Sequence, residues 1–190
     1  MSNALKDYIM TKVLAVDIDG TLIEKGHEMH EENRKALNRL MKDDFLVGLA
    51  SGRQTSAIDG DWKEWGLDRE FDFYIGMNGA MLRDVNENKN IDCGLMSFDQ
   101  AKRIAKHLEH LNLSTNYYCE DDISYILHLD EPTKRSMERN KDKKFKFKII
   151  DDIEEIAHLK IYRVLFRIEE EDMHLIQEYV AEHPFPEEFE

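Results

Sequence analysis

Three short apolar runs in the first half of the chain constrain its fold more than any other feature. They span residues 12–16 (KVLAV), 45–50 (FLVGLA) and 71–77 (FDFYIGM). Near-continuous apolar runs of this length are typical of strands that are buried on both faces, as in a parallel sheet. The intervening residues 31–43 and 54–65 carry apolar side chains at helical spacing. Strand, helix, strand, helix, strand predicts a doubly wound, Rossmann-like α/β core.

The second half of the chain has a different hydrophobic period. Apolar and polar residues alternate over 123–129, 145–149 and 161–168, whereas 97–111 and 170–182 have helical spacing. Alternation with a period of two predicts strands that have one wet face, which is typical of an antiparallel sheet. We therefore expect an α+β module in which helices cover one face of an open sheet.

A polar stretch separates these two patterns. It runs from Arg83 to Asn90 (RDVNENKN), and polar segments of this kind often join domains. The sequence therefore predicts an α/β core over residues 1–84 and an α+β domain over residues 85–190.

The charge of the chain excludes several classes of function. Forty acidic residues against 26 Lys and Arg give a formal net charge of −14. Such a surface repels nucleic acids and anionic membranes, and no apolar run approaches the ~20 residues that span a bilayer. The two cysteines, Cys93 and Cys119, do not make a disulfide framework, so we expect free thiols and a cytoplasmic protein.

The segment VLAVDIDGTL carries the clearest chemical signal. Asp17 and Asp19 follow the first apolar run, and residues i and i+2 of an extended chain point to the same side. Gly20 permits a sharp turn, and Thr21 adds a hydroxyl beside backbone N–H groups that can hold anionic oxygens. One carboxylate can attack phosphorus while the other transfers protons. The pair also favours a bound divalent cation, and Mg²⁺ prefers oxygen ligands.

This DxDGTL motif after an apolar strand resembles the first motif of the haloacid dehalogenase (HAD) superfamily. The resemblance implies that Asp17 is the nucleophile and Asp19 the general acid and base. It further implies that Mg²⁺ is bound by the Asp17 side chain and the Asp19 backbone carbonyl. A capped turn with two solvated acids is the alternative interpretation of the same residues.

Two further segments are similar to motifs of the same superfamily. In LASGR, Ser51 matches the hydroxyl residue that holds the transferring phosphate, and Gly52 and Arg53 match a variant found in capped sugar-phosphate phosphatases. Arg53 either faces the substrate or pairs with a core carboxylate. In MNGA, Asn78 matches the Asn-Gly-Ala of the Cof-type branch, which places it near the substrate; an Asn-Gly turn is the alternative.

Three other groups of residues are interpreted as structural. His107 and His110 share one predicted helix, but no third metal ligand accompanies them. The lysines within 141–148 are typical of a solvated face. Asp151 and Asp152 follow a strand that alternates with lysines, which favours the second domain rather than an acidic core motif.

The resemblance runs from about Lys12 to the end of the chain, but later parts of the family pattern are missing. Cof-type relatives carry a later Lys, a Gly-Asp-x-x-x-Asp segment and further core strands, and none of these is found before residue 190. We therefore expect an incomplete HAD core with an inserted α+β cap, shortened by truncation or gene decay. Its unpaired core edge is expected to favour self-association.

Two functions remain open at this point. The first is a Mg²⁺-dependent phosphatase that acts on a small phosphorylated metabolite, most readily a sugar phosphate, with a phosphomutase using the same acids as a variant. The second is a non-catalytic remnant that binds metal, a metabolite or a protein partner.

Overall fold

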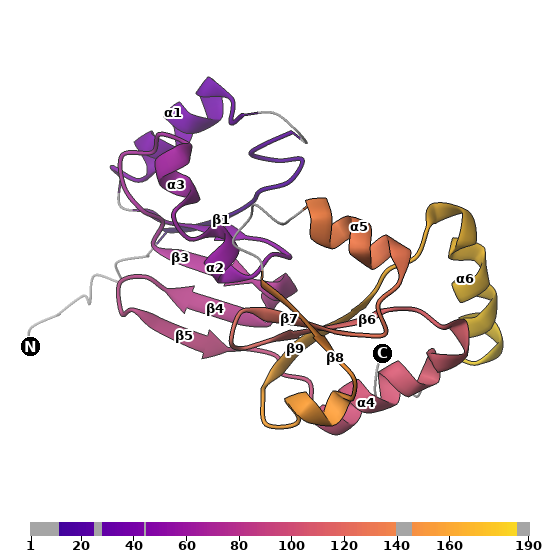
Figure 1. The fold of residues 1–190 in the computed structure, drawn as a ribbon. Coiled ribbons are helices and arrows are strands. Elements are labelled where there is room, and N and C mark those ends of the chain that lie inside the picture. Colours follow the sequence, from indigo (N-terminus) through magenta and orange to yellow (C-terminus); the bar gives the residue numbers. More distant parts are fainter. Residues whose placement is uncertain (1–11, 25–27, 44, 140–145, 186–190) are drawn as a thin grey trace, which may run out of the picture. The chain divides into compact units, whose positions relative to one another are not determined.

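The computed structural model describes residues 12–24, 28–43, 45–139 and 146–185. The chain divides into two compact units, one that ends at Cys93 and one that begins at Gly94. Each unit contains one sheet (Figure 1). Within the described ranges, no helix is long and apolar enough to cross a membrane.

The first unit contains a five-stranded sheet in the order β1-β2-β3-β4-β5. β1, β2 and β3 are parallel, which confirms the predicted α/β fold class, and β4 and β5 continue the sheet as an antiparallel hairpin. The strands are β1 (Lys12–Asp17), β2 (Phe45–Ala50), β3 (Phe73–Gly76), β4 (Met81–Asp84) and β5 (Lys89–Asp92). The helices are α1 (Glu31–Leu40), α2 (Thr55–Ile58), α3 (Asp61–Glu64) and the 3₁₀ turn η1 (Met77–Gly79).

One face of this sheet carries the core of the unit. Leu14 and Val16 of β1 lie beside Val47 and Leu49 of β2, and this face packs against apolar residues of the helices. α1 and α3 lie on the same side of the sheet (Figure 1). The opposite face leaves larger apolar side chains in solvent. Its exposed members are Val13 at 60%, Leu46 at 38% and Ile91 at 37%.

Two expectations for the first unit are wrong in detail. The single helix expected over 54–65 is broken into α2 and α3, because Gly60 at their junction has a left-handed backbone with φ of 91°. The polar stretch expected to link the domains forms the end of β4, a turn and the start of β5. The division between the compact units consequently falls after Cys93, and not after residue 84.

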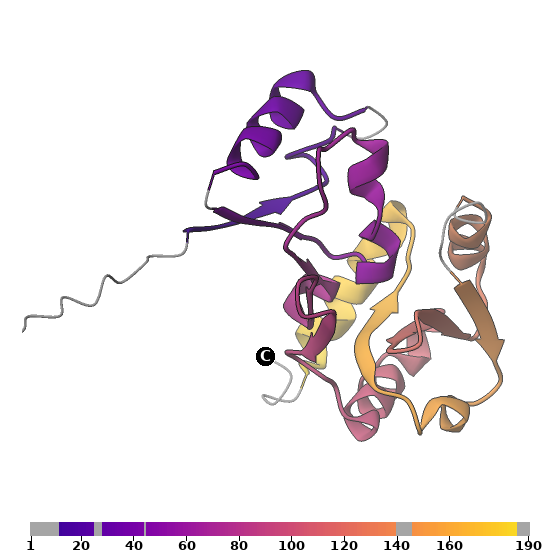
Figure 2. The same cartoon turned by 90° about the vertical axis from the view of Figure 1, so that its left-hand side faces the viewer.

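The second unit contains a four-stranded sheet in the order β8-β7-β6-β9, with α4 beside it (Figure 2). The strands are β6 (Thr115–Cys119), β7 (Ile123–Leu127), β8 (Lys146–Ile150) and β9 (Ile161–Phe166). The helices are α4 (Phe98–His107), α5 (Glu131–Arg139) and α6 (Met173–Glu182). The 3₁₀ turns are η2 (Glu109–Leu111), η3 (Ile153–Ile156) and η4 (Glu170–Asp172).

The sheet of the second unit differs from the open antiparallel sheet predicted for it. β8 lies parallel to β7, whereas β6 is antiparallel to both of its neighbours. All five residues of β6 are buried, and so are Ser124, Tyr125 and Ile126 of β7. Small polar residues occupy the face that was expected to be wet, and Asn116 and Ser124 are at most 1% exposed. Alternation indicated β7 but not its burial, and β6 was not among the strands expected from the sequence.

The two cysteines are free, as expected. Cys93 is exposed and Cys119 is buried in the core of the second unit. Burial, together with the negative charges of Asp121 and Glu120, raises the pKa of the Cys119 thiol to about 12. Cys119 is therefore a neutral packing residue at physiological pH.

Replacement of Gly48 by Ala tests the packing of the parallel sheet. A Cβ atom at residue 48 would lie 2.5 Å from the backbone carbonyl oxygen of Phe73, and backbone cannot move aside cheaply. We expect Gly48→Ala to lower the free energy of unfolding by about 1–3 kcal/mol, as measured by urea denaturation. Ala15 is opposite Gly48 in the register and is exposed, so Ala15→Gly is the matched control. A Gly48→Ala protein as stable as the wild type would contradict the tight β2–β3 contact.

Candidate active site

A tight turn follows β1 and holds the two acids of the DxDGTL segment. The backbone carbonyl of Ile18 accepts hydrogen bonds from the N–H groups of Leu22 and Ile23, both at 3.0 Å. Ile18 and Leu22 are buried and anchor the turn in the core. Gly20 has φ of 84°, a left-handed conformation that costs glycine little. The buried apolar residues therefore fix the turn, and its polar residues remain at the surface.

Asp17 and Asp19 have different partners. The hydroxyl of Thr21 donates to Asp17 Oδ2 at 3.4 Å. Both carboxylate oxygens of Asp19 accept from Arg53, with Nε to Oδ2 at 3.1 Å and Nη2 to Oδ1 at 2.6 Å. The Asp19 side chain is still 65% exposed, so solvent weakens this ion pair. Of the two positions expected for Arg53, the structure shows the pairing with a core carboxylate.

The register of the parallel strands brings three loops to one edge of the sheet. Asp17, Ala50 and Ile75 are aligned across β1, β2 and β3. The residues that follow each of them therefore leave the sheet at the same end. Ligands bind at this carboxyl end in open α/β sheets. Asp19, Ser51 and Asn78 all come from these loops, so the fold positions the predicted site residues on one edge.

Backbone hydrogen bonds join the second and third loops. Ser51 N–H donates to Ile75 O at 2.9 Å, Met77 N–H to Arg53 O at 2.9 Å, and Asn78 N–H to Ser51 O at 3.3 Å. The Ser51 hydroxyl accepts from Arg53 N–H at 3.2 Å. The segment that carries Ser51 and Arg53 is therefore held against the segment that carries Asn78. Gly52 lies between the two residues of the first segment.

The third loop has an unusual backbone. Met77, Asn78 and Gly79 have φ of 54°, 57° and 96°, and a left-handed methionine costs free energy. Gly76 permits the close approach of the second loop, because a Cβ there would lie 3.0 Å from Arg53 O and 2.7 Å from Thr55 Cγ2. The sequence interpretation missed Gly76 as a site-supporting residue. A glycine that ends an apolar run was the available signal, since such glycines often mark close backbone contact.

A metal at this edge would rely on few protein ligands. Among the described residues, no cluster contains three or more His, Cys, Asp or Glu side chains placed to hold a metal ion. Mg²⁺ is usually held by one or two carboxylates together with water. The Asp17 carboxylate and the Asp19 backbone carbonyl fit that minimum, because Arg53 engages only the side-chain oxygens of Asp19. The donor set is therefore compatible with a weakly held Mg²⁺.

The residues that were interpreted as structural lie in the second unit. Asp151 follows β8, and the Asp152 carboxylate accepts from Glu154 N–H at 3.0 Å, which caps η3. His107 Nε2 lies 2.8 Å from the backbone carbonyl of His183, and its ring contacts Tyr179. Lys146 and Lys148 are on β8, whereas lysines 141, 143 and 144 fall outside the described residues.

Comparison with known proteins identifies the family. The family model for haloacid dehalogenase-like hydrolases matches residues 14–188. A 5-amino-6-(5-phospho-D-ribitylamino)uracil phosphatase from Bacillus subtilis is 29% identical over 112 residues, which are 59% of this chain and 37% of that protein. The first curated relatives are each matched over between 33% and 45% of their length.

Solved structures show the same fold. A protein from Thermotoga maritima, TM0651, has a TM-score of 0.69 at 23% identity, over 92% of this chain and 62% of that one. The HAD subclass IIB sugar phosphatase BT4131 has a TM-score of 0.67 at 21% identity, over 90% and 63% of the two chains. Because the family model covers most of the chain, the protein belongs to the haloacid dehalogenase-like hydrolase family.

Proposed function

We propose that the protein is a Mg²⁺-assisted phosphatase that acts on a small phosphorylated metabolite, with sugar phosphates as the first class to test. The observation that carries this proposal is the placement of Asp17 and Asp19 at the carboxyl end of a parallel sheet, beside the guanidinium of Arg53. The named activities of the phosphatase relatives support it. A cytoplasmic location is part of the same proposal.

Each site residue has a proposed role in phosphoryl transfer. The Asp17 carboxylate attacks phosphorus and forms an aspartyl-phosphate while the ester P–O bond breaks. Asp19 gives a proton to the leaving oxygen and later takes one from the attacking water. The side chains of Thr21, Ser51 and Asn78 hold the phosphate oxygens, and Gly20 and Gly52 let the loops come close to them. The N–H groups of Gly20 and Thr21 donate within the turn, to Ile23 O and Ile18 O. Mg²⁺ held by Asp17 and Asp19 would offset the negative charge of the phosphate and the nucleophile.

The Arg53–Asp19 ion pair has to separate before this chemistry can begin. Asp19 must hold a proton to act as an acid, and the guanidinium engages both of its oxygens. A phosphate dianion attracts the guanidinium more strongly than one carboxylate, and it offers the same two-oxygen geometry. We propose that Arg53 moves from Asp19 to the substrate phosphate, which releases Asp19 for proton transfer.

The second candidate function is a non-catalytic protein that binds a metal or a metabolite. The same ion pair favours it, because an Asp19 carboxylate held by Arg53 cannot transfer protons to a leaving group. The described residues also supply no third carboxylate at the site. Turnover separates the two candidates, since a binding protein would hold Mg²⁺ or phosphate without releasing product.

The self-association expected from the sequence is also proposed here. Among the described strands β1 pairs only with β2, so its outer edge presents free backbone groups. A twofold axis normal to the sheet would pair two copies antiparallel with Leu14 opposite Leu14, and Val13 opposite Ala15 on the exposed face. The net charge of −14 opposes association, so added salt should strengthen it.

Asp17→Asn tests the nucleophile. The amide is nearly isosteric but does not attack phosphorus, so we expect hydrolysis of p-nitrophenyl phosphate with millimolar Mg²⁺ to be abolished. The wild-type turnover is itself expected to be well below the ~10 s⁻¹ of a median enzyme, because the metal is weakly held. Asp43→Asn, at an exposed position, is the control for the charge change. A variant that keeps a tenth of the activity would exclude Asp17 as the nucleophile.

Asp19→Asn tests the acid and base. Loss of proton transfer should slow turnover by roughly 10²–10⁴ for substrates with poor leaving groups. An activated aryl phosphate needs less protonation, so its first step should be affected less. Equal losses for alkyl and activated aryl phosphates would contradict the role of Asp19 as an acid.

Arg53→Met tests the proposed exchange of partners. Removal of the guanidinium leaves the negative charge of Asp19 unbalanced beside the metal position, so the affinity for Mg²⁺ should rise by roughly three- to tenfold, the factor expected for loss of an exposed ion pair. The affinity for inorganic phosphate should fall in the same protein. Isothermal titration measures both, with Arg34→Met, which breaks the exposed pair with Glu31, as the control. Unchanged affinities for both ligands would show that Arg53 takes no part in binding at this site.

Val13→Lys tests the edge of β1. A lysine on an edge strand disfavours strand pairing, so the variant should be monomeric in sedimentation velocity at a concentration where the wild type is dimeric in high salt. Leu175→Lys, which replaces another exposed apolar residue on α6, is the control. A monomeric wild type, or equal dimerisation of all three proteins, would contradict the proposal.

A further inference from the structure

The sheet of the second unit has two different faces. On one face Tyr117 of β6 joins the apolar cluster that also contains Ala101 of α4. Its neighbour Asn116 points to the other side, because successive side chains of a strand alternate. α4 and α5 lie on opposite sides of this sheet (Figure 1, Figure 2). Leu165 of β9 is opposite Asn116 and lines a cavity together with residues of α5, so α5 covers the face that carries Asn116.

The face beneath α5 contains buried oxygens that lack hydrogen-bond partners. In the register Tyr118 is opposite Ser124, so Ser124 shares the face of Asn116. Asn116 Oδ1 and Ser124 Oγ are buried, and neither has a partner within the described part of the chain. Ile126, which is opposite Asn116, is fully buried but lies outside the apolar cluster of the unit. Buried polar groups without partners destabilise the structure that buries them, so these oxygens oppose the docking of α5.

α5 meets this face with small polar side chains. Thr133 and Ser136 are the buried residues of the helix, and the Thr133 hydroxyl has no hydrogen-bond partner among the described residues. All residues of α5 are described, and none of them, Met137 included, belongs to the apolar cluster of the unit. Short helices gain most of their stability from packing an apolar face. α5 is therefore held less firmly than α4, which contributes Ala101 to the cluster.

Polar contacts hold α5 at its N-terminal end and along one side. The Asp130 carboxylate accepts from Thr133 N–H at 2.8 Å and from Ser114 N–H at 2.9 Å. Further along the helix, Arg135 forms an ion pair with Glu169, which follows β9. The two side chains of this pair are 56% and 43% exposed, so solvent weakens it. The first contact is placed to act as a hinge and the second as a latch that opens easily.

We infer that α5 is a hinged lid, which opens from this face of the sheet while the rest of the second unit stays folded. Asp130 remains in place as the hinge, and the ion pair between Arg135 and Glu169 breaks. Opening lets water reach the oxygens of Asn116 and Ser124. Local openings of this kind occur in elements that have few buried apolar contacts. The inference concerns the second unit alone and does not depend on the proposed phosphatase activity.

Hydrogen exchange of the full chain tests the lid. The amides to compare are the hydrogen-bonded ones of α5, beginning with Lys134, whose N–H donates to Asp130 O at 3.0 Å, and those of α4. After correction for intrinsic rates, the α5 amides should exchange roughly tenfold faster or more. Their exchange should also depend little on low concentrations of urea, because a local opening exposes little surface. Equal rates and equal urea dependence in the two helices would overturn the inference.

Two variants should shift this exchange in opposite directions. Thr133→Val removes the unpaired hydroxyl at nearly constant shape, so the closed lid should be more stable and α5 should exchange about tenfold more slowly. Arg135→Met breaks the latch and should accelerate the exchange roughly two- to fivefold. Faster exchange in Thr133→Val would show that the hydroxyl is paired in the closed lid, which would overturn the inference. If Thr133→Val does not fold, Arg135→Met and the urea dependence still decide.

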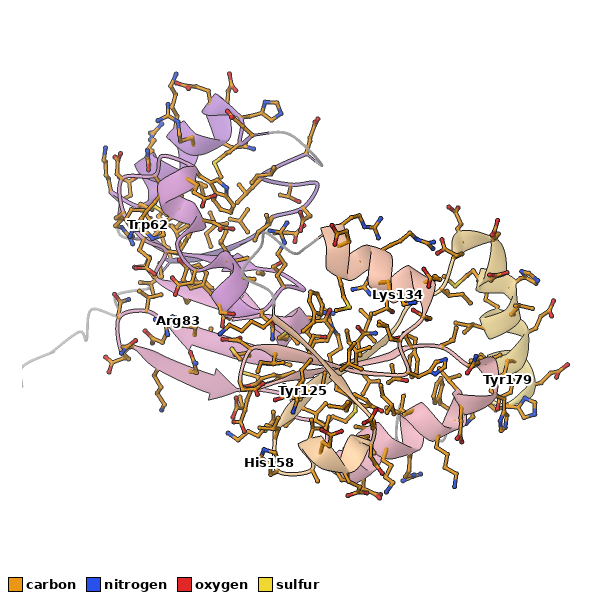
Figure 3. The ribbon with its side chains drawn as sticks, viewed as in Figure 1. Trp62, Arg83, Tyr125, Lys134, His158 and Tyr179 are labelled. Carbon is orange, nitrogen blue, oxygen red and sulfur yellow. The ribbon has the colours of Figure 1, made fainter. Side chains whose placement is uncertain are left out.

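Matched controls separate the lid from the rest of the fold. Thr115→Val makes the same change on the opposite face of β6 from Asn116 and should leave the exchange of α5 unchanged. Lys134→Met removes a cation from α5 (Figure 3), but its ion pair with Glu131 lies within the helix. Its exchange should therefore change by less than about twofold. Equal effects of Lys134→Met and Arg135→Met would overturn the latch.

Discussion

Parallel pairing of β1, β2 and β3 is the constraint on which the first unit depends. Alignment of Asp17, Ala50 and Ile75 makes three strands end at one edge. The proposed site depends on that alignment, because the three loops are far apart in the sequence. The absence of a side chain at Gly48 and Gly76 permits the close contacts that hold the strands and loops together. The packing of the strands and loops therefore determines which side chains meet at this edge.

Electrostatics sets the limits of that chemistry. Two acids at a sheet edge repel a phosphorylated substrate, and the structure offsets only part of this repulsion, through Arg53. A pair of unit charges ~4 Å apart interacts by about 4 kcal/mol at an effective dielectric near 20. One guanidinium cannot balance both a nucleophile and a phosphate dianion, so the proposed phosphatase would need a bound cation for fast turnover. The same reasoning explains why weak Mg²⁺ binding predicts slow catalysis.

The sequence predicted the three parallel strands because near-continuous apolar runs have few alternatives. Their expected burial on both faces was wrong for β1, because only one face of that strand packs on the core and Val13 on the other is 60% exposed. The sequence also located the loops of Asp17, Ser51 and Asn78, since each follows such a run. The prediction failed where the hydrophobic pattern of a segment and its burial in the fold disagree. β5 and the turn before it are largely polar, so they resembled a linker. β8 alternates as its place at the edge of the sheet requires, but alternation did not indicate that it pairs parallel to β7. The burial of Asn116 and Ser124 could not be predicted from their polar side chains, because the segments that cover them are distant in sequence. The pairing of Arg53 with Asp19 depends on loop conformation, which the motif alone left open.

The central claim is that the loops after β1, β2 and β3 form one phosphate-binding edge. Titration of the isotopically labelled protein with orthovanadate, in the presence of Mg²⁺, tests this claim most directly through backbone amide shifts. The account predicts that the amides of Gly20, Thr21, Ser51 and Asn78 shift together along a single binding curve. Separate curves for these amides, or shifts restricted to residues beyond Cys93, would contradict it.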